Sequence, residues 1–512
     1  MTTVRLSTFA VLAISGIALA HPSHQLEGGL GAPSPATVLL ITSPELAEAW
    51  IPFADWKRKL GKPVRILTTT QIADRYEAPD LQEKIRRCVR NHVDHLGTRW
   101  VILGGDSQPD RKGVVPDRDT AHETMWGKNE RIPTDLYYLG KKDWDADDDG
   151  VYGEWEDDRE SISYPDGRVG LGRIPVRSVK DVKAYTEKVI SYESHYPLRN
   201  FATRMTYTCT VPAAYAKVRA SWDRHVSKVL PDGSVQRFFA DETPWDRDKP
   251  GDYALSPTNW VRLLNAKTTG KLHLHGHGYL PSWILENDEP LTAEHVGLLK
   301  NVGAYPVITT VSCFTGQFDA KRDPCIAEAM LRRPRAGAIV IVAPSREGKP
   351  HFHDPERDFP LMVKEGKLDG TTRTMTEFWE NGIGKNLTAG EALMTTKAGM
   401  AEDAKKSATF HLCLCELNLL GDPTLPLRRK DPRRPKLFGP KSLQAGNLNL
   451  VIETDAPGAL ISILDTHGLY GVQVTDDTGN ATFPISVAKD AVITVTVSGP
   501  DLNAAWLEIP VH

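Results

Sequence analysis

Three histidines occupy alternate positions in the stretch KLHLHGHGYL, residues 271–280. His273, His275 and His277 end an apolar run, and Gly278 follows the last of them. Side chains at alternate positions of a strand point to one face of the sheet, so the three imidazoles would lie in a row. Such a row allows two kinds of chemistry: a zinc cluster, or a catalytic base at the end of a strand.

A second apolar run, PVITTVSC at residues 306–313, ends in Cys313. A loop, a helix near residues 292–300 and a turn at Gly303 separate it from the histidines. A crossover of this length can make the two runs neighbouring parallel strands. Because ligands of open α/β sheets bind at the carboxyl ends of strands, we expect His277 and Cys313 to meet at one rim.

A cysteine beside an imidazole can carry out acyl transfer. The thiolate is the nucleophile, and the imidazole can take its proton or stabilise the thiolate, then protonate a leaving amine. The N–H groups of Gly278 and Cys313 could face a developing oxyanion, and one such donor contributes about 3–4 kcal/mol. We expect His277 to be catalytic and His273 and His275 to be structural, because a covered central strand leaves little room for an open metal site.

An acidic loop, DADDDGVYGEWE at residues 145–156, fits the pattern D-x-D-x-D-G-x5-E of calcium loops. Alternate carboxylates, a backbone carbonyl and a terminal glutamate can converge on one hard cation. The expected ligands are Asp145, Asp147, Asp149, Val151 and Glu156. The flanking segments are not typical of EF-hand helices, so we expect an isolated, structural Ca²⁺ site; the alternative is a solvated acidic loop. No organic cofactor is expected.

The bulk composition limits the function classes. Lys and Arg number 62 and Asp and Glu 66, so no basic excess favours a nucleic-acid partner. Residues 1–20 have the layout of a signal peptide cut after Ala20, and no later run is long enough to span a membrane. We therefore expect export to the periplasm or the cell exterior, with a monomer favoured. Six cysteines are few. Cys413 and Cys415 lie two residues apart, would share one face if they lie on a strand, and are expected to be buried small hydrophobes.

Short apolar runs alternate with capped helices from residue 36 onward. Expected strands lie at 37–42, 63–69, 99–106, 204–211, 271–278, 306–313 and 337–345, and capped helices begin after Ser43, Asp80, Ser178, Ser256 and Asp323. This alternation predicts an α/β fold with a parallel sheet. We expect a linker at 21–35, an N-terminal α/β subdomain with the calcium loop at 36–200, and a catalytic subdomain at 201–428.

The amino-acid composition changes near Lys430. RRKDPRRPKLFGP is basic and rich in proline, which is typical of a linker, here 429–440. Residues 441–512 alternate apolar and polar positions, with turns every eight to twelve residues. This pattern predicts a small C-terminal β-sandwich of the immunoglobulin-like kind, without chemistry of its own.

The blocks HGHG and VSCFTGQFD resemble the His-Gly and Cys blocks of the gingipain-like cysteine peptidases of family C25, relatives of caspases. WVILGGDSQ, IPTDLYYLGKKDWDADDDGVYGE, VGLGRIPVRS and LNLLGDPTLPL follow the family's order and spacing. The resemblance covers roughly residues 36–427. It implies a caspase-like catalytic region in two α/β subdomains, followed by an immunoglobulin-like domain.

The resemblance also implies roles for individual residues. Cys313 would be the nucleophile, His277 its partner, and the amides of Gly278 and Cys313 the oxyanion donors. One departure concerns the carboxylate that some members place after the strand corresponding to 204–211. Here that stretch reads VPAAYAKVRASWD, with no acid before Asp223. Either the third member comes from elsewhere, or the pair works as a dyad.

Three functional hypotheses follow. The first is a secreted cysteine endopeptidase that hydrolyses peptide bonds of polypeptide substrates through an acyl-enzyme. The second is a calcium-stabilised binding or attachment protein on a catalytically degenerate scaffold of the same family, which the missing carboxylate and the β-module motivate. The third is a metallohydrolase that uses the histidine row.

Overall fold

The computed structural model describes residues 36–108, 113–124, 127–141, 144–196, 200–210, 215–239, 252–279, 282–285, 289–321, 324–349, 370–466 and 468–512. The side chains of 123–129, 215–221 and 252 are outside this description. The predicted signal peptide and the linker at 21–35 lie outside the described residues. Within them, no helix is both long enough and apolar enough to cross a membrane.

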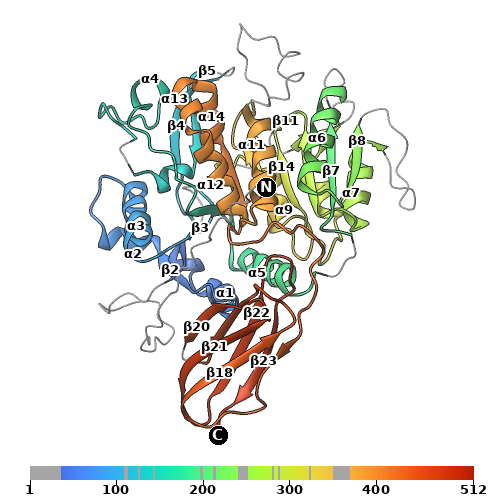
Figure 1. Ribbon diagram of the computed structural model, residues 1–512. Helices are drawn as coiled ribbons and strands as arrows, with labels where there is room; N and C mark the ends of the chain where they lie inside the picture. Colours follow the sequence, from blue (N-terminus) through green and yellow to red (C-terminus); the bar gives the residue numbers. More distant parts are fainter. Residues whose placement is uncertain are drawn as a thin grey trace, which may run out of the picture.

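One sheet of eleven strands organises the chain from residue 38 to residue 421 (Figure 1). Its strands in spatial order are β2 (Val64–Thr68), β1 (Val38–Thr42), β3 (Trp100–Gly104), β6 (Gly170–Arg173), β16 (Leu417–Gly421), β15 (Val340–Pro344), β14 (Val307–Thr310), β10 (Lys271–His275), β7 (Arg204–Cys209), β8 (Ser234–Phe239) and β9 (Asp252–Ala254). The expected mostly parallel α/β sheet is therefore confirmed.

The sheet consists of two halves that run in opposite directions. Strand β16 is parallel to β6 but antiparallel to β15, and all other neighbours are parallel. The carboxyl ends of the six strands from β15 to β9 therefore form a rim of their own, and both predicted reactive strands, β10 and β14, belong to it.

Helices cover the sheet. Those described are α1 (Ile51–Lys59), α2 (Thr69–Arg75), α3 (Leu81–His95), α4 (Trp155–Asp158), α5 (Val179–Ser194), α6 (Tyr215–Val229), α7 (Pro257–Asn265), α8 (Ala293–Gly297), α9 (Ile326–Arg332), α11 (Gly370–Trp379), α12 (Ala389–Gly399), α13 (Ala401–Lys406) and α14 (Ala408–Glu416). Several begin where a cap was expected: the Ser178 side chain accepts a hydrogen bond from the amide of Asp181, 3.2 Å away, at the start of α5.

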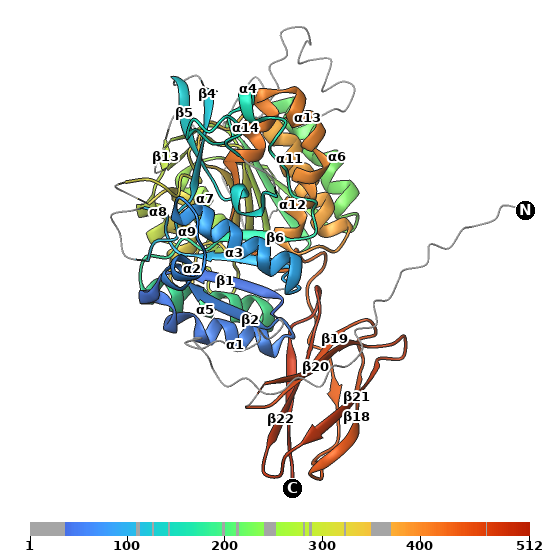
Figure 2. The ribbon, with the colours of Figure 1, turned by 90° about the vertical axis from the view of Figure 1, so that its left-hand side faces the viewer.

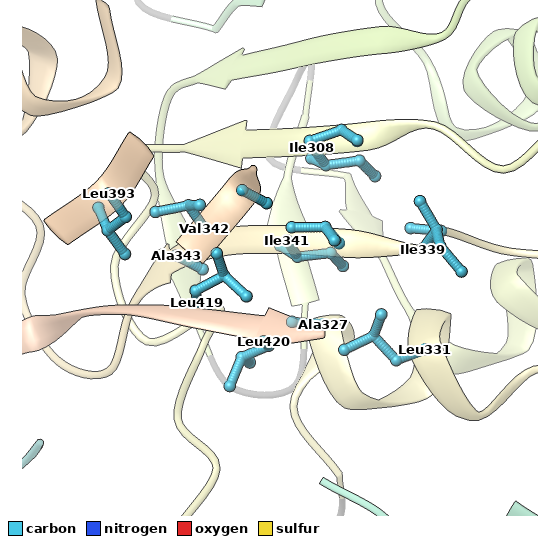
Figure 3. Close-up of a cluster of buried hydrophobic side chains, with 14 of the residues drawn as sticks. Ile308, Ala327, Leu331, Ile339, Ile341, Val342, Ala343, Leu393, Leu419 and Leu420 are labelled. Atoms are coloured by element: carbon cyan, nitrogen blue, oxygen red, sulfur yellow. The ribbon is translucent and has the colours of Figure 1, made fainter. Parts of the chain in front are cut away.

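The core lies between these layers. Figure 3 shows side chains of β14, β15 and β16 packed with Ala327 and Leu331 of α9 and Leu393 of α12. Strand β15 reads VIVAP and is buried along its whole length, as a strand covered on both faces must be. Strands β10 and β14, which end at the candidate site, are buried along their whole length in the same way.

Two smaller sheets flank the main one. The hairpin of β4 (Arg118–Thr124) and β5 (Gly127–Thr134) follows β3 in the chain. Beyond β10, the short strands β11 (Gly278–Tyr279), β12 (Ser282–Ile284) and β13 (Pro290–Leu291) form an antiparallel sheet.

The C-terminal residues form the predicted β-sandwich, below the α/β region in Figures 1 and 2. One antiparallel sheet contains β17 (Leu437–Phe438), β18 (Gly446–Thr454) and β21 (Asn480–Val487); the other contains β20 (Leu469–Val474), β19 (Leu460–Leu464), β22 (Val492–Ser498) and β23 (Ala505–Pro510). They enclose a hydrophobic core of their own. The domain boundaries drawn from the sequence stay predictions.

Three local predictions need correction. The helix expected directly after Ser43 starts as two 3₁₀ turns, Pro44–Leu46 and Glu48–Trp50, before α1. The helix expected at Asp323 begins at Ile326, with Cys325 as its N-cap. Cys413 and Cys415 are buried as expected, but they lie on helix α14 and not on a strand.

Candidate active site

His277 and Cys313 lie at the same rim of the sheet, just past the ends of β10 and β14. The two strands are parallel neighbours, with Lys271 opposite Val307 and Leu274 opposite Thr310. The amide of Val311 continues the ladder with a 3.2 Å hydrogen bond to the carbonyl of Leu274. Extending this register by three residues sets His277 opposite Cys313. The His277 side chain is exposed, and Cys313 is partly buried.

Gly278 lets the segment after β10 approach the segment after β14 closely. A Cβ at this position would lie 2.4 Å from the carbonyl oxygen of Cys313 and 2.9 Å from Cβ of Ser312. Any side chain would therefore push the two segments apart. The amide of Ile284 donates to the carbonyl of His277 at 3.1 Å, so 277 and 284 form a hydrogen-bonded pair of the β11–β12 ladder. Because such pairs alternate, the N–H of Gly278 points away from β12.

A sharp turn displays Cys313 at the rim. Phe314 adopts a φ of 60°, which is uncommon for a bulky residue and is typical of functional turns. Its amide donates to the carbonyl of Arg346, 2.6 Å away. Arg346 in turn binds Asp319 through two hydrogen bonds of 2.8 and 2.6 Å. Asp319 therefore anchors Arg346, the residue whose carbonyl holds the amide of Phe314.

The thiol of Cys313 is neutral in this environment. Burial raises its pKa to about 11, and the nearby carboxylates of Glu416 and Glu347 act in the same direction. The sulfur lies 3.9 Å from the carbonyl oxygen of Gly348, to which the thiol donates. A group with this pKa holds its proton at neutral pH, so a base has to remove it before or during attack.

The residue directly after β7, next to His277, is Thr210 and not an acid. The Thr210 amide donates to the carbonyl of His275 at 3.0 Å, and its hydroxyl oxygen lies 3.4 Å from the amide of His277. Asp223, the first acid after this strand, is bound to the hydroxyl of Tyr207 and the guanidinium of Arg237, each at 2.7 Å. The described structure therefore places Asp223 in another contact, with Tyr207 and Arg237.

The other two histidines of the row are buried. The Nδ1 of His273 lies 3.0 Å from the hydroxyl of Thr309, and its ring stacks on Trp222 with centroids 4.0 Å apart. Burial lowers the pKa of His273 well below its ordinary value. In the described chain, two groups of side chains could hold a metal ion, and the histidine row contributes to neither. This arrangement disfavours the metallohydrolase hypothesis.

The acidic loop brings three of its expected ligands together. Carboxylate oxygens of Asp145, Asp147 and Asp149 lie within 4.8 Å of one another. The Asp145 carboxylate accepts the amides of Asp149 at 3.0 Å and Gly150 at 3.1 Å. Gly150 has a φ of 83°, which provides the sharp turn.

The remaining two expected ligands are placed differently. Glu156 lies on α4 and outside the group of converging carboxylates. Val151, whose backbone carbonyl was the expected donor, follows the turn, and its amide donates to the Asp149 carboxylate at 2.7 Å. The loop is closed instead by the buried Asp158, which accepts the amides of Ala146 and Gly153 at 2.6 and 2.8 Å. A hard cation fits the three aspartates, while Glu156 would have to approach them.

Sequence reasoning missed the residues that approach the site from elsewhere in the chain. Thr210, Gly348 and Arg346 carry no motif of their own, and contacts alone reveal them. The apolar run 337–345 followed by Arg346 and Glu347 has the same form as the two reactive strands, a strand ending in polar groups. That signal could have drawn attention to the segment.

Comparison with known proteins gives one consistent result. The model of peptidase family C25 matches residues 32–428. Gingipain R2 of Porphyromonas gingivalis strain W83 is 23% identical over 458 residues, which cover 87% of this chain and 53% of gingipain R2. Gingipain R1 of the same species is 22% identical over 457 residues, which cover 87% of this chain and 40% of gingipain R1. The chain thus spans about half the length, or less, of these relatives.

Solved structures match the fold over nearly the whole chain. The crystal structure of the Arg specific cysteine proteinase gingipain R (RGPB) gives a TM-score of 0.68 at 19% identity, covering 94% of this chain and 99% of that one. The complex of Porphyromonas gingivalis RgpB pro- and mature domains gives 0.69 at 19% identity, covering 93% and 100%. The likeness confirms the fold inferred from the sequence.

Proposed function

Because the chain belongs to peptidase family C25, we propose that it is a secreted cysteine endopeptidase whose nucleophile is Cys313 and whose base is His277. The observation that carries the proposal is the adjacency of these residues at the carboxyl ends of two parallel strands. Catalytic groups of α/β folds occur at this position. The substrates are polypeptides, the class on which the family acts.

The reaction follows from the positions of these groups. The imidazole of His277 accepts the thiol proton of Cys313 as the sulfur attacks the carbonyl carbon of the scissile bond. The oxygen becomes an oxyanion and is bound by the N–H groups of Gly278 and Cys313. The protonated imidazole then gives its proton to the leaving amine. In the second half, His277 takes a proton from water as the water attacks the thioester, and it then gives this proton to the departing sulfur, which releases the acid and restores the thiol.

The protonation state of the Cys313 thiol determines whether a thiolate is present before the substrate binds or forms only during the attack. With a pKa of about 11, Cys313 is not a resting thiolate at neutral pH. Proton transfer to His277 therefore accompanies attack. Substrate binding also has to break the contact between the thiol and the carbonyl of Gly348. We therefore expect Cys313 to react only after a peptide substrate is bound beside it.

The proposal includes a structural Ca²⁺ site in the acidic loop. Asp145, Asp147 and Asp149 would hold the ion together with the carbonyl of Val151, and Glu156 would complete the shell. The mutual repulsion of the three carboxylates supports this assignment, because a divalent cation removes it. The proposed export rests on the sequence of residues 1–20, and the proposed monomeric state on the sequence alone.

A peptide-hydrolysis assay tests the proposal. A pool of internally quenched peptides is incubated with purified protein, with and without reductant and calcium. The proposal expects thiol-dependent cleavage that the Cys313→Ala variant loses while its thermal midpoint stays the same. Equal cleavage by the variant would refute Cys313 as the nucleophile. Cys88→Ala is the matched control, because Cys88 is buried in α3, away from the rim.

Two observations favour a second candidate, a binding or attachment protein on this scaffold. The raised thiol pKa and the threonine beside His277 are what a site without catalytic power would show. An irreversible thiol-reactive peptide distinguishes the two candidates. A peptidase is labelled at Cys313 at neutral pH, whereas a binding protein leaves this thiol unmodified.

A further inference from the structure

A buried cluster of two histidines and one cysteine lies between the β4–β5 hairpin and helix α14. His122 comes from β4, and His411 and Cys415 come from one face of α14, four residues apart. All three side chains are buried. Figures 1 and 2 both place the hairpin beside α14, at the end of the α/β region that faces away from the β-sandwich.

The ligand atoms of the three residues converge. One nitrogen from each histidine and the sulfur of Cys415 lie within 4.8 Å of one another. The Nε2 of His411 is 3.7 Å from Sγ of Cys415, and the two imidazole rings have centroids 4.8 Å apart. With Zn–N of about 2.0–2.1 Å and Zn–S of about 2.3 Å, a tetrahedral site separates nitrogen and sulfur by about 3.5 Å. The spacing of 3.7 Å between His411 Nε2 and Cys415 Sγ is close to this value, and the ligand atom of His122 lies within 4.8 Å of both.

An unsatisfied buried nitrogen points to a missing ligand. The Nε2 of His122 is buried and has no hydrogen-bond partner, in a residue that is only 5% exposed. Leaving a buried polar atom unpaired costs about 1–3 kcal/mol, so native structures rarely do so without a reason. A metal ion bound to this nitrogen would remove the cost.

The surroundings of the cluster have the groups that orient metal ligands. The hydroxyl of Tyr164 hydrogen-bonds to Nδ1 of His411, and the hydroxyl of Thr120 to the sulfur of Cys415. The carbonyl of Gly153 lies 2.7 Å from Nε2 of His411, so a metal ion bound at this nitrogen would replace that hydrogen bond. Metal-binding histidines usually donate their second N–H to a partner such as the Tyr164 hydroxyl, which fixes the tautomer and the ring.

We propose that His122, His411 and Cys415 form a structural Zn²⁺ site that joins α14 to the β4–β5 hairpin. Two imidazoles and a thiolate suit a borderline-soft ion, in contrast to the carboxylates of the acidic loop, which suit a hard one. On binding, the thiol of Cys415 releases its proton to solvent and forms the Zn–S bond. His411 moves its proton from Nε2 to Nδ1, which then donates to the oxygen of Tyr164.

The proposed zinc site would fix the position of helix α14. Helix α14 leads directly into β16, the strand that joins the two halves of the sheet. A metal that fixes this helix to the hairpin would hold the junction in place. The ion would therefore stabilise the fold without taking part in peptide hydrolysis, and its presence does not depend on the proposed peptidase activity.

Cobalt substitution tests the site on the purified full-length chain. Metal content is measured first, and the metal is then removed with a chelator and replaced with Co²⁺. The expected result is one equivalent of zinc as purified, and a thiolate-to-Co²⁺ absorption band in the near ultraviolet after replacement. Co²⁺ bound by the acidic loop gives no such band, because that loop has no sulfur ligand.

Three variants test whether the absorption band arises from Cys415. Cys415→Ala is expected to lose the band, and the matched control Cys413→Ala, two residues away on the same helix, is expected to keep it. Tyr164→Phe is expected to keep the band with about 10–100-fold weaker affinity. A wild-type protein without the band, or a Cys415→Ala protein that retains it, would overturn the proposal. The wild-type spectrum decides even if Cys415→Ala does not fold.

Discussion

Replacement of Gly278 by alanine tests whether the two reactive strands depend on close contact. The new Cβ would lie 2.4 Å from the carbonyl oxygen of Cys313, 2.7 Å from Cγ2 of Thr315 and 2.9 Å from Cβ of Ser312. Two of these atoms belong to the backbone or to a β-carbon, so they cannot swing aside. Carbon contacts are normally about 3.5 Å, so the segments have to separate by about 1 Å.

A displacement of this size has a predictable effect on the rate. A misplacement of about 1 Å typically costs about 100-fold, which corresponds to about 2.7 kcal/mol in the activation free energy. Overpacking of the same contact costs about 1–3 kcal/mol of stability. We therefore expect Gly278→Ala to lower kcat for peptide hydrolysis by about 100-fold while the protein stays folded at 25 °C.

The assay compares Gly278→Ala with Gly297→Ala. Gly297 ends α8 in the crossover between the same two strands, and a Cβ there meets no atom within 4 Å. The control should keep the wild-type kcat and gain slightly in thermal midpoint, since alanine favours the helix. Thermal midpoints of both variants separate local displacement from unfolding. A Gly278→Ala enzyme with wild-type kcat would refute the reasoning.

Three further predictions concern protonation, ion pairing and calcium. The pKa of Cys313 is raised to about 11, so its alkylation by iodoacetamide should rise tenfold per pH unit from pH 7 to pH 10; a plateau near pH 7 would instead reveal a thiolate–imidazolium pair. Lys57 is fully buried and lies 2.7 Å from the carboxylates of Glu193 and Asp422, so Lys57→Met should lower the free energy of unfolding by about 3–5 kcal/mol. The control Arg58→Ala removes the more exposed pair with Asp55 and should cost less than about 1 kcal/mol. Equal thermal midpoints of the two variants would contradict this. Calcium at about 100 times its Kd should stabilise the protein by about 2.7 kcal/mol, and Asp147→Asn should reduce this gain; a thermal midpoint that does not respond to calcium or EGTA would exclude the site.

The sequence predicts the part of the fold that follows from local patterns. Helix caps such as Asp80, which accepts the amide of Glu83 at 2.7 Å, mark the starts of helices, and short apolar runs mark the buried strands. The pairing of β10 with β14 follows from the length of the crossover between them. The placement of His277 and Cys313 at one rim could therefore be inferred before the structure.

Contacts between distant segments could not be inferred in this way. The run LCLC at 412–415 is apolar at every position, and a fully buried helix and a fully buried strand have the same pattern. The direction of β16, the approach of Gly348 to Cys313 and the meeting of His122 with His411 depend on the packing of whole layers. No spacing within the sequence encodes them.

Peptide mapping after covalent labelling tests the central claim most directly. Native protein is treated at neutral pH with a panel of peptidyl chloromethyl ketones, and the labelled residue is identified by mass spectrometry. Of the six cysteines, five are buried and Cys313, at the rim, is partly exposed. The account predicts label on Cys313 alone, and its loss in a folded His277→Ala protein. Unlabelled Cys313 throughout the panel, or equal labelling without His277, would contradict it.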